Sequence, residues 1–403
     1  MAVSLAAPTE TGRIFAELQQ GREQLAAMDD DVVATQVELS EIPAPTHDER
    51  RRGRDVAARM RRLGLTVTVD DTVGNVIGRR AGASDEAPVV VCAHLDTVFA
   101  ADTDVRVRRE GSRLVGPGIG DNARGLAAML ALARVIDGAS LRTMRPIDFI
   151  ASVGEEALGD LRGAKHHFAN GGRDAAAAII LDGPGDERVV HRAVGSRRMR
   201  IRFTGPGGHS WSAYGLPNPL NAAGTVAARV ARINIPVTPR TALTVARISG
   251  GLAINAIPGE AIVELDLRSV SQAVVERIAS EIAAIVRAAL AEENERRARG
   301  TPPLAVALES LGERPAGETP ADDPLVVAAL EATRLVGREP EAGAASTDAN
   351  VPISLGIPAI ALGGGGHGGD AHTPGEWFEN VEGTLGLARA LTIVCAAARL
   401  AHR

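Results

Sequence analysis

The sequence predicts an α/β fold, a mixed and largely parallel sheet flanked by helices, with a second α+β domain inserted into it. Apolar runs typical of buried strands, such as 87–93 and 147–153, alternate with helical segments such as 123–136. This alternation stops near residue 195 and resumes after Pro315. Acidic and imidazole residues directly follow the strand-like runs, at the edge where open α/β sheets bind ligands.

The first stretch of the chain supports the α/β prediction element by element. The helical spacing of apolar residues predicts helices at 11–28, 31–41, 48–63 and 123–136. Alternating or continuous apolar runs predict strands at 65–69, 75–79, 87–93, 147–153 and 175–181. A glycine-rich turn at 116–121 precedes the helix that begins at residue 123. We expect this turn to bring its last residue, Asp121, to the ligand-binding edge of the sheet.

The stretch after residue 195 predicts a different arrangement. Strands are expected at 197–204, 242–248, 261–268 and 304–309, with helices at 219–233 and 272–299. This β-α-β-β-α-β order is ferredoxin-like. A helix at 323–336, a strand at 357–362, the glycine run 363–369 and a helix at 381–401 then return to α/β character. We therefore expect residues 1–194 and 311–403 to form one domain and 195–310 a second domain inserted into it, since 403 residues exceed one ordinary core.

Composition and charge exclude several classes of function. The net charge is −6, and no part of the chain gathers enough basic residues to bind nucleic acid. No apolar run approaches about 18 residues, which argues against a membrane span. The first residues lack a basic stretch followed by an apolar one, so we expect no signal peptide. Cys92 and Cys395 lie in apolar runs, which argues against disulfides, and the expected location is the cytoplasm.

Acidic and imidazole residues near the expected strand ends carry the chemical prediction. They are His94, Asp96, Asp121, Glu155, Glu156, Asp182 and His372. Five carboxylates that converge without cations would repel one another, and a pair of divalent ions removes that conflict. Imidazole and carboxylate ligands without thiolate suit zinc first, with manganese and cobalt as alternatives. Two such ions about 3.5–4 Å apart could bridge and deprotonate one water and polarise a carbonyl group.

Several segments in a fixed order make this sequence resemble a known family. The chain resembles the co-catalytic zinc peptidases that include carboxypeptidase G, acetylornithine deacetylase, succinyl-diaminopimelate desuccinylase and the tripeptide aminopeptidase peptidase T. The matching segments are AHLDTVF (93–99), GPGIGDNARG (116–125), GEEALGDLRGAKH (154–166), GPGGHSWSAYG (205–215), INAIPGE (254–260), DLR (266–268), STDANVPISLGIP (346–358) and GGGGHGGDAHTPGEW (363–377). Together they cover most of the chain.

The resemblance implies a role for each candidate metal ligand. His94 and Asp182 would hold one ion, Glu156 and His372 would hold the other, and Asp121 would bridge the two. The family's fold, a zinc-peptidase-like catalytic domain with an inserted lid and dimerisation domain, agrees with the order of the expected elements. We therefore expect two divalent metal ions for each chain.

The resemblance also implies roles for residues beside the ligands. Glu155 would be the general base, which takes the proton of the water and delivers it to the leaving amine. Asp96 would accept the imidazole N–H of His94 and fix its tautomer. In this family the peptide after the bridging aspartate is commonly cis, so we expect a cis bond between Asp121 and Asn122.

The inserted domain resembles the lid and dimerisation domain of the same family. His209 would reach the substrate, often across a dimer interface, and help to hold the developing oxyanion. Asn255 and Arg268 would bind polar or carboxylate groups of the substrate, for which a bidentate guanidinium is well suited. A homodimer is therefore expected.

The identity of Asp182 bears on the substrate. Aminopeptidases and dipeptidases of the family tend to carry Asp at this position, whereas carboxypeptidases and deacylases tend to carry Glu. The sequence therefore predicts a dizinc metallopeptidase that hydrolyses di- or tripeptides through a metal-bridged hydroxide, closest to the peptidase T branch. The alternative is an N-acyl amino acid deacylase or a glutamate-type carboxypeptidase of the same family.

Other interpretations of these segments stay open at this stage. The glycines at 116–120 could form a nucleotide-binding loop, although the third spaced glycine and a well-placed acidic residue are missing. The glycine run 363–369 could be a flexible loop, or it could let backbone approach metal and substrate. Asp348 and Asn350 could cap a helix over 351–355 or contact substrate, and His367 is expected to be an exposed loop histidine. A catalytically inactive scaffold would have lost a ligand or the base, and none is missing.

Overall fold

The computed structural model describes residues 9–401, which form two compact units. One unit joins the chain up to Ala193 to the chain from Glu318 onward, and the other spans Val194–Gly317. Each unit has a hydrophobic core made of its own residues. The boundary at Gly317 lies beyond residue 310, where the expected insertion ends, because the last strand of the second unit continues to Arg314.

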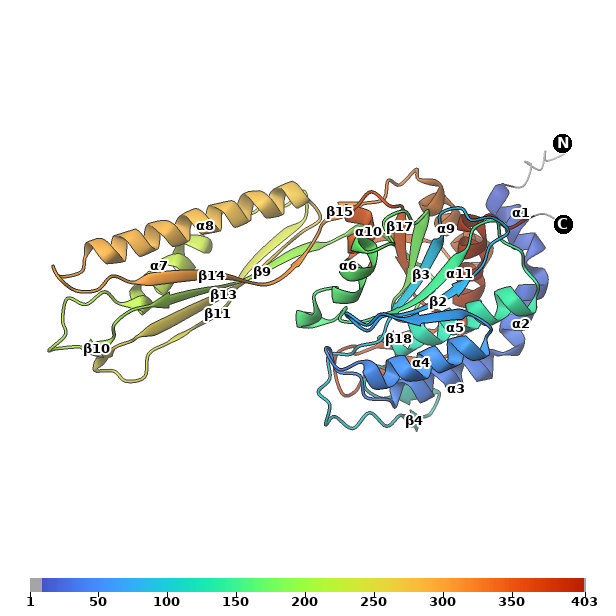
Figure 1. Ribbon diagram of the computed structural model, residues 1–403, viewed down its shortest axis with the longest axis horizontal. Helices are drawn as coiled ribbons and strands as arrows, with labels where there is room; N and C mark the ends of the chain where they lie inside the picture. The colour runs from blue at the N-terminus through green and yellow to red at the C-terminus, as the bar shows by residue number, and fades with distance from the viewer. Residues whose placement is uncertain (1–8, 402–403) are drawn as a thin grey trace. The chain divides into compact units, whose positions relative to one another are not determined.

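A mixed sheet forms the centre of the first unit (Figure 1). Its order is β1 (Thr66–Val69), β2 (Val76–Arg80), β6 (Ile147–Ser152), β3 (Val89–His94), β7 (Ala177–Leu181), β17 (Ala359–Leu362), β8 (Arg188–Ala193) and β15 (Gly317–Glu318), and β16 (Glu341–Ala345) pairs with β8. The four central strands β6, β3, β7 and β17 run parallel to one another. The pairs β1–β2, β2–β6 and β17–β8 are antiparallel. This confirms the predicted fold class. The strands β8 and β16 were not predicted from the sequence.

Helices cover both faces of this sheet. Residues 89, 91 and 93 of β3 pack in the larger core, and Val90 and Cys92 pack in the core on the opposite face. The larger core is lined by α1 (Glu10–Glu17), α2 (Gln19–Ala27), α3 (Asp29–Ser40), α4 (Arg50–Arg62), α5 (Ala123–Gly138), α9 (Pro324–Leu335) and α11 (Gly383–Ala397). The smaller core is lined by α6 (Arg162–Ala169) and α10 (Asn350–Ser354).

Two details of the expected helices are corrected. The single helix expected at 11–28 is α1 followed by α2, because the chain leaves helical geometry at the fully buried Leu18 (φ −84°, ψ 12°). Asp348 and Asn350 do not cap α10: the N-cap is Ala349, without a side-chain capping bond, and Asn350 is the first residue of the helix.

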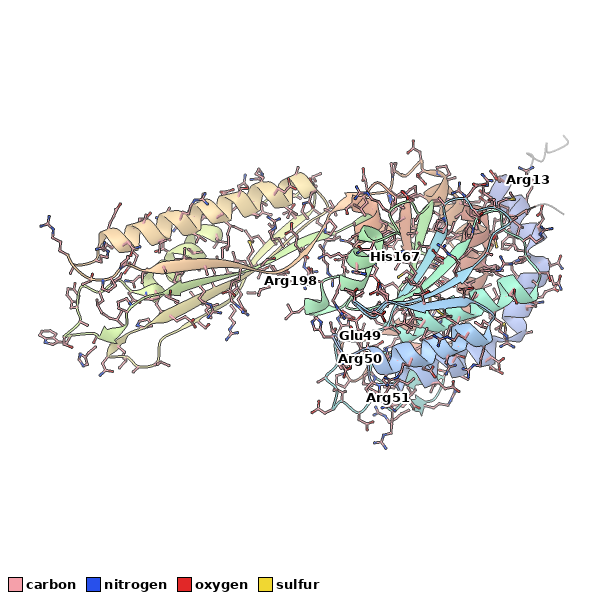
Figure 2. The ribbon with its side chains drawn as sticks, viewed as in Figure 1. Arg13, Glu49, Arg50, Arg51, His167 and Arg198 are labelled. Atoms are coloured by element: carbon pink, nitrogen blue, oxygen red, sulfur yellow. The ribbon has the colours of Figure 1, made fainter. Side chains whose placement is uncertain are left out.

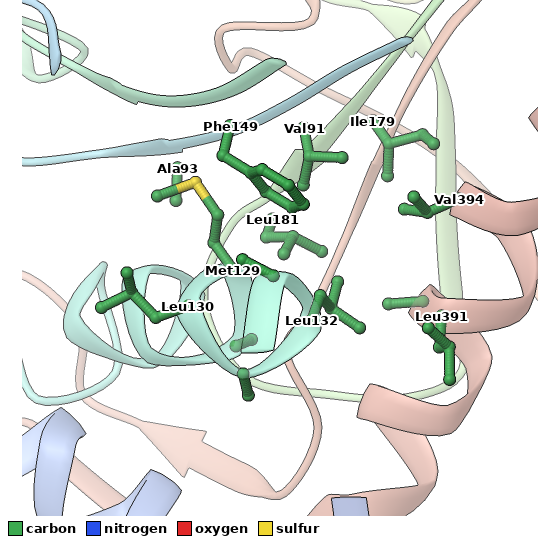
Figure 3. Packing of buried hydrophobic residues seen from close by; sticks show 14 of the residues in the cluster. Val91, Ala93, Met129, Leu130, Leu132, Phe149, Ile179, Leu181, Leu391 and Val394 are labelled. Atoms are coloured by element: carbon green, nitrogen blue, oxygen red, sulfur yellow. The ribbon is translucent and has the colours of Figure 1, made fainter. Parts of the chain in front are cut away.

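Helix α5 is buried on nearly all sides, and it begins at the functional edge of the sheet. Figure 3 shows Met129 and Leu132 of α5 among Phe149 and Leu181 of the strands above it. The side chain of Asn122 caps the helix by accepting the N–H of Gly125. A buried helix fixed in this way gives Asp121, which directly precedes the cap, a defined position.

A small antiparallel sheet in the first unit was not predicted from the sequence. It has the order β18 (His367–Gly369), β19 (Trp377–Glu379), β5 (Arg113–Val115) and β4 (Arg108–Glu110). Because β5 leads into the turn 116–121 and β18 precedes His372, pairing between β19 and β5 brings these two segments together. The glycine run 363–369 is therefore not a loop along its whole length, since its last three residues form β18.

The second unit is a four-stranded antiparallel sheet with helices on one face. Its order is β11 (Thr241–Gly250), β13 (Glu260–Ser269), β9 (Gly195–Thr204) and β14 (Ala305–Arg314), and α7 (Pro219–Val230) and α8 (Gln272–Glu295) complete the β-α-β-β-α-β order. Met199, Ile201 and Phe203 of β9 point to the helices. The alternate residues are arginines, and Arg200, for example, lies 2.6 Å from Glu264 of β13. Arg198, labelled in Figure 2, belongs to this row of charged residues.

None of the helices described between residues 9 and 401 combines the length and hydropathy that a membrane crossing requires. Both cysteines are buried and unpaired.

Candidate metal centre

His94 is the last residue of β3, and its hydrogen bonds fix which ring nitrogen faces the cluster. The side chain is 2% exposed, and Nδ1 lies 3.0 Å from the carbonyl oxygen of Asp96. A carbonyl oxygen can only accept, so Nδ1 carries the proton and Nε2 presents its lone pair when the ring is neutral. Nε2 lies 3.0 Å from Oδ1 of Asp121 and 3.8 Å from Oδ1 of Asp182.

Asp121 lies between two imidazoles. Its Oδ1 faces Nε2 of His94, and its Oδ2 lies 3.2 Å from Nε2 of His372. The same nitrogen of His372 lies 2.9 Å from Oε1 of Glu156. The two carboxylate oxygens therefore face different donor sets, which is the geometry of a carboxylate that bridges two ions. The Asp121–Asn122 peptide is cis, as predicted.

Within residues 9–401 the donor atoms form overlapping groups whose members lie within 4.8 Å of one another. These groups are His94–Glu155–Glu156, His94–Asp121–Asp182 and Asp121–Glu156–His372. The last two contain the five residues expected as ligands, in the expected pairing around Asp121. The candidate ligands come from the carboxyl ends of β6, β3 and β7, from the turn before α5 and from the segment after β18, so the fold brings together residues that lie far apart in sequence.

Asp96 does not make the hydrogen bond to the imidazole of His94 that was expected for it. Its carboxylate lies 3.6 Å from Nδ1 of His94, which bonds to the backbone carbonyl instead. The carboxylate oxygens accept the N–H groups of Glu155, at 2.9 Å, and Glu156, at 3.0 Å, and also the hydroxyl of Thr46. Burial alone would raise the pKa of Asp96, but His94 and these N–H donors lower it to about 2. Asp96 therefore holds the loop that carries the two glutamates.

The charges of the cluster fit divalent cations. Burial would lower the pKa of His94, but its contacts with Asp121, Asp182 and Asp96 outweigh burial and raise it well above the usual value. Hydrogen bonds to Asp121 and Glu156 raise the pKa of His372 to about 10. Both shifts arise because the carboxylates around the imidazole nitrogens favour positive charge there. Oxygen and imidazole donors without thiolate suit zinc, manganese or cobalt.

Buried polar side chains that the sequence analysis missed hold the ligand loops. Asn122 donates to the carbonyl oxygen of Leu181 and accepts the N–H of Gly183, so it ties the residues on both sides of Asp182 to the start of α5. Arg52, 1% exposed, donates to the carbonyl oxygen of Leu95, between His94 and Asp96. The segment GPGIGDNARG indicates a role for Asp121, and its neighbour Asn122 stands out only by adjacency. No motif in the sequence indicates a role for Arg52.

Glu155, the expected general base, is buried beside the ligands. It follows β6, is 5% exposed and belongs to the donor group with His94 and Glu156. Its backbone N–H is bonded to Asp96, which sets the position of the side chain relative to the cluster. The structure therefore places this carboxylate among the candidate ligands.

The residues expected to contact substrate from the insertion all lie in the second unit. His209, in β10 (Gly208–His209), is exposed, and its Nδ1 accepts the N–H of Trp211. Its Nε2 therefore carries the proton and can donate. Asn255 lies alongside, since its carbonyl oxygen accepts the N–H of Ser210. Arg268 is half-exposed on β13 and donates from Nε to Asp266.

The structure gives positions to the residues for which the sequence left more than one role open. Asp348 is fully buried and accepts the hydroxyl of Ser152 at 2.5 Å, and burial raises its pKa to about 6. Oδ1 of Asn350 accepts the N–H of Thr347. His367 is exposed, but it lies in β18 rather than in a loop. The glycine run approaches other backbone: a Cβ on Gly365 would lie 2.1 Å from the carbonyl oxygen of Gly383.

A comparison with protein families decides the family. Residues 90–397 match the model of peptidase family M20/M25/M40. The chain belongs to this family. Membership confirms the predicted resemblance and the enzyme class, a hydrolase of peptide or amide bonds. Members of the family depend on metal, in agreement with the donor cluster.

Individual relatives of this M20 chain are distant. A putative LysW-lysine/LysW-ornithine hydrolase of Aeropyrum pernix is 30% identical over 234 residues, which cover 58% of the chain and 61% of the relative. The succinyl-diaminopimelate desuccinylase of Corynebacterium glutamicum is 26% identical over 62% of the chain and 69% of its own length. A tripeptidase structure from Staphylococcus aureus superposes with a TM-score of 0.74 at 22% identity, over 91% of the chain and 98% of that structure. At this identity the structural match shows the fold.

Proposed function

We propose that this protein hydrolyses an amide bond of a small peptide and needs two divalent cations to do so. Zinc is the metal that we favour. One ion would be held by His94, Asp121 and Asp182, and the other by Asp121, Glu156 and His372. The observation that carries the proposal is the position of Asp121, whose two oxygens each face a different imidazole.

The residues around the cluster supply the remaining steps. Cations bound there would lower the pKa of a shared water and polarise the scissile carbonyl group. Glu155 accepts the proton of the attacking water and returns it to the leaving amine. Asp96 keeps Glu155 and Glu156 in place by binding both N–H groups. His94 keeps its proton on Nδ1, so that Nε2 serves as a ligand.

Small peptides are the substrates that we favour. Asp182 is the residue that aminopeptidases and dipeptidases of the resembling family tend to carry, and the structural neighbours include a tripeptidase. The names of the relatives in sequence support the alternative, since a desuccinylase removes an acyl group from an amine. An N-acyl amino acid deacylase or a glutamate-type carboxypeptidase is therefore the second candidate.

Residues of the second unit are proposed to contact the substrate. His209 would donate from Nε2 to the oxyanion, and Asn255 and Arg268 would bind polar groups of the substrate.

We propose a homodimer, which sedimentation velocity would detect as twice the mass of one chain. The two unpaired, buried cysteines agree with a cytoplasmic location, where thiols stay reduced.

Two matched substrates test the function. The chain should be purified, freed of metal with a chelator, and titrated with Zn²⁺ while metal content and hydrolysis are measured. We expect about two ions per chain, loss of activity with chelator and recovery with metal. Trialanine should be cleaved and N-acetyl-trialanine should not, because an aminopeptidase requires the free amine. The reverse preference would establish the deacylase or carboxypeptidase alternative, and failure to bind metal would refute the proposal.

A further inference from the structure

A buried carboxylate outside the donor cluster holds the turn that carries Asp121. Glu376 is 1% exposed, and its Oε1 accepts the N–H groups of Gly120 and Asp121, both at 2.8 Å. Its Oε2 accepts the N–H of Gly118 at 3.0 Å. One side chain thus binds three backbone donors within four residues. A carboxylate with this many N–H donors is a strong acceptor site, because charge-assisted bonds exceed neutral ones.

The backbone of Glu376 holds the same turn. Its carbonyl oxygen accepts the N–H of Gly116 at 2.9 Å, which extends the pairing between β19 and β5 by one residue. The turn is shaped to receive the side chain: Gly118 has φ +72°, and a Cβ on Gly120 would lie 3.2 Å from Oε1 of Glu376. Residues with side chains would therefore disturb the contact at these positions.

Glu376 also belongs to the segment that carries His372. The two residues are joined by a tight turn in which the N–H of Glu376 bonds to the carbonyl oxygen of Thr373, and that of Thr373 bonds to Asp370. His372 itself has a positive φ of 66° within this turn. A displacement of Glu376 would therefore move His372 relative to Asp121, although the two ligands lie 251 positions apart in the chain.

We propose that Glu376 is a positioning residue that fixes the relation between Asp121 and His372, and thereby sets the affinity of the ion held by Asp121, Glu156 and His372. The inference rests on the proposed metal function. The other ion depends less on Glu376, because His94 ends β3, Asp182 directly follows β7, and Asn122 ties the Asp182 loop to Asp121. The loss of Glu376 should therefore affect the two ions unequally.

Titration of the metal-free chain with Co²⁺ tests this inference through the visible absorption of the bound ion. In Glu376→Gln one oxygen that accepts N–H becomes an amide nitrogen, so at least one backbone donor loses its acceptor. We expect one of the two Co²⁺ ions to bind 10–100-fold more weakly, the range known for residues that orient metal ligands. The other ion should change by about threefold or less, and no change in either affinity would overturn the proposal.

Matched variants separate positioning from general damage. Glu379→Gln makes the same change three residues later, at a side chain whose oxygen lies 3.9 Å from Arg113, and should leave both affinities unchanged. His372→Ala should remove the same ion that Glu376→Gln weakens, and adding Glu376→Gln to it should not further weaken the remaining ion. Equal weakening of both ions in Glu376→Gln would overturn the selective role.

Folding controls keep the test decisive. Circular dichroism and thermal unfolding of the metal-free variants show whether they are folded. If Glu376→Gln does not fold, Glu376→Asp keeps the charge but is one methylene too short to reach all three N–H groups, and the same selective weakening is expected. If the unaltered chain binds no Co²⁺, the proposed metal function itself fails, which differs from two normal affinities in the variant.

Discussion

At the scale of single residues, the cluster consists of candidate metal ligands and of side chains that hold the loops on which these candidates lie. Asp96, Asn122 and Glu376 each accept or donate hydrogen bonds to the backbone beside a candidate ligand. These contacts matter because a metal site loses affinity when its ligands are free to move. The proposed chemistry would therefore depend on residues that never touch the metal or the substrate.

The role of Glu155 makes the first prediction. Glu155→Ala should leave the metal content unchanged and lower kcat by about 10²–10⁴-fold, because a general base contributes on this order. Glu156→Ala, at the neighbouring position, should instead lower the metal content, since Glu156 faces His372. Turnover numbers and metal analysis of both variants check the distinction. A near-normal kcat in Glu155→Ala would remove it from the role of base.

Asp96 makes a second prediction at this scale. In Asp96→Asn one of the two oxygens that accept the N–H groups of Glu155 and Glu156 becomes a donor, which leaves a buried N–H without an acceptor at about 1–3 kcal/mol. We expect kcat/KM to fall about 10–100-fold. The control Asp102→Asn changes an exposed aspartate and should have no effect. Equal activities of the two variants would contradict the assignment.

At the scale of elements, the small sheet and the glycine run bring distant segments close together. The strands β5 and β19 are three residues long, yet their pairing sets the distance between the turn 116–121 and the segment after β18. The glycine run lies against the start of α11, where Arg124 donates to the carbonyl oxygens of Gly364 and Gly383. Backbone meets backbone here, which explains why glycine is needed.

A pair of glycine variants tests this close approach. Gly365 and Gly337 have similar positive φ angles, +87° and +82°. A Cβ at Gly365 would lie 2.1 Å from the carbonyl oxygen of Gly383, whereas nothing lies within 4 Å of one at Gly337. Gly337→Ala should therefore cost about 1–2 kcal/mol from conformation alone. Gly365→Ala should cost about 1–3 kcal/mol more from overpacking. Urea unfolding measures both, and equal midpoints would argue against the close contact.

At the scale of the whole molecule, the two units have separate cores, and all the candidate metal ligands belong to the first unit. His94, Asp121, Asp182 and His372 lie in the first unit, and the core of the second unit is made of its own strands and helices. Separate cores of this kind commonly unfold in separate transitions. Metal binding should therefore stabilise one part of the molecule selectively.

Calorimetry of the metal-free and metal-loaded chain tests this prediction. A ligand that binds only the folded state stabilises it by about 2.7 kcal/mol at a free concentration of 100 times Kd. We expect Zn²⁺ to raise the midpoint of one transition and to leave the other unchanged. The second transition should match that of the isolated residues 194–317 if this segment folds alone. A uniform shift of both transitions would contradict the assignment of all ligands to one unit.

The sequence by itself determined the α/β class, the ferredoxin-like order of the second unit and the residues of the donor cluster. The class and the order follow from hydrophobic periodicity, and the candidate donors follow from polar residues near strand ends, which are local properties of the chain. The resemblance to the zinc peptidase family assigned the metal ligands among them. The tertiary structure decided the contacts of Asp96, Asn122, Arg52 and Glu376, and the strands of three residues that bring Asp121 to His372. Such features have no local signal, because each depends on backbone groups supplied by segments far away in the sequence.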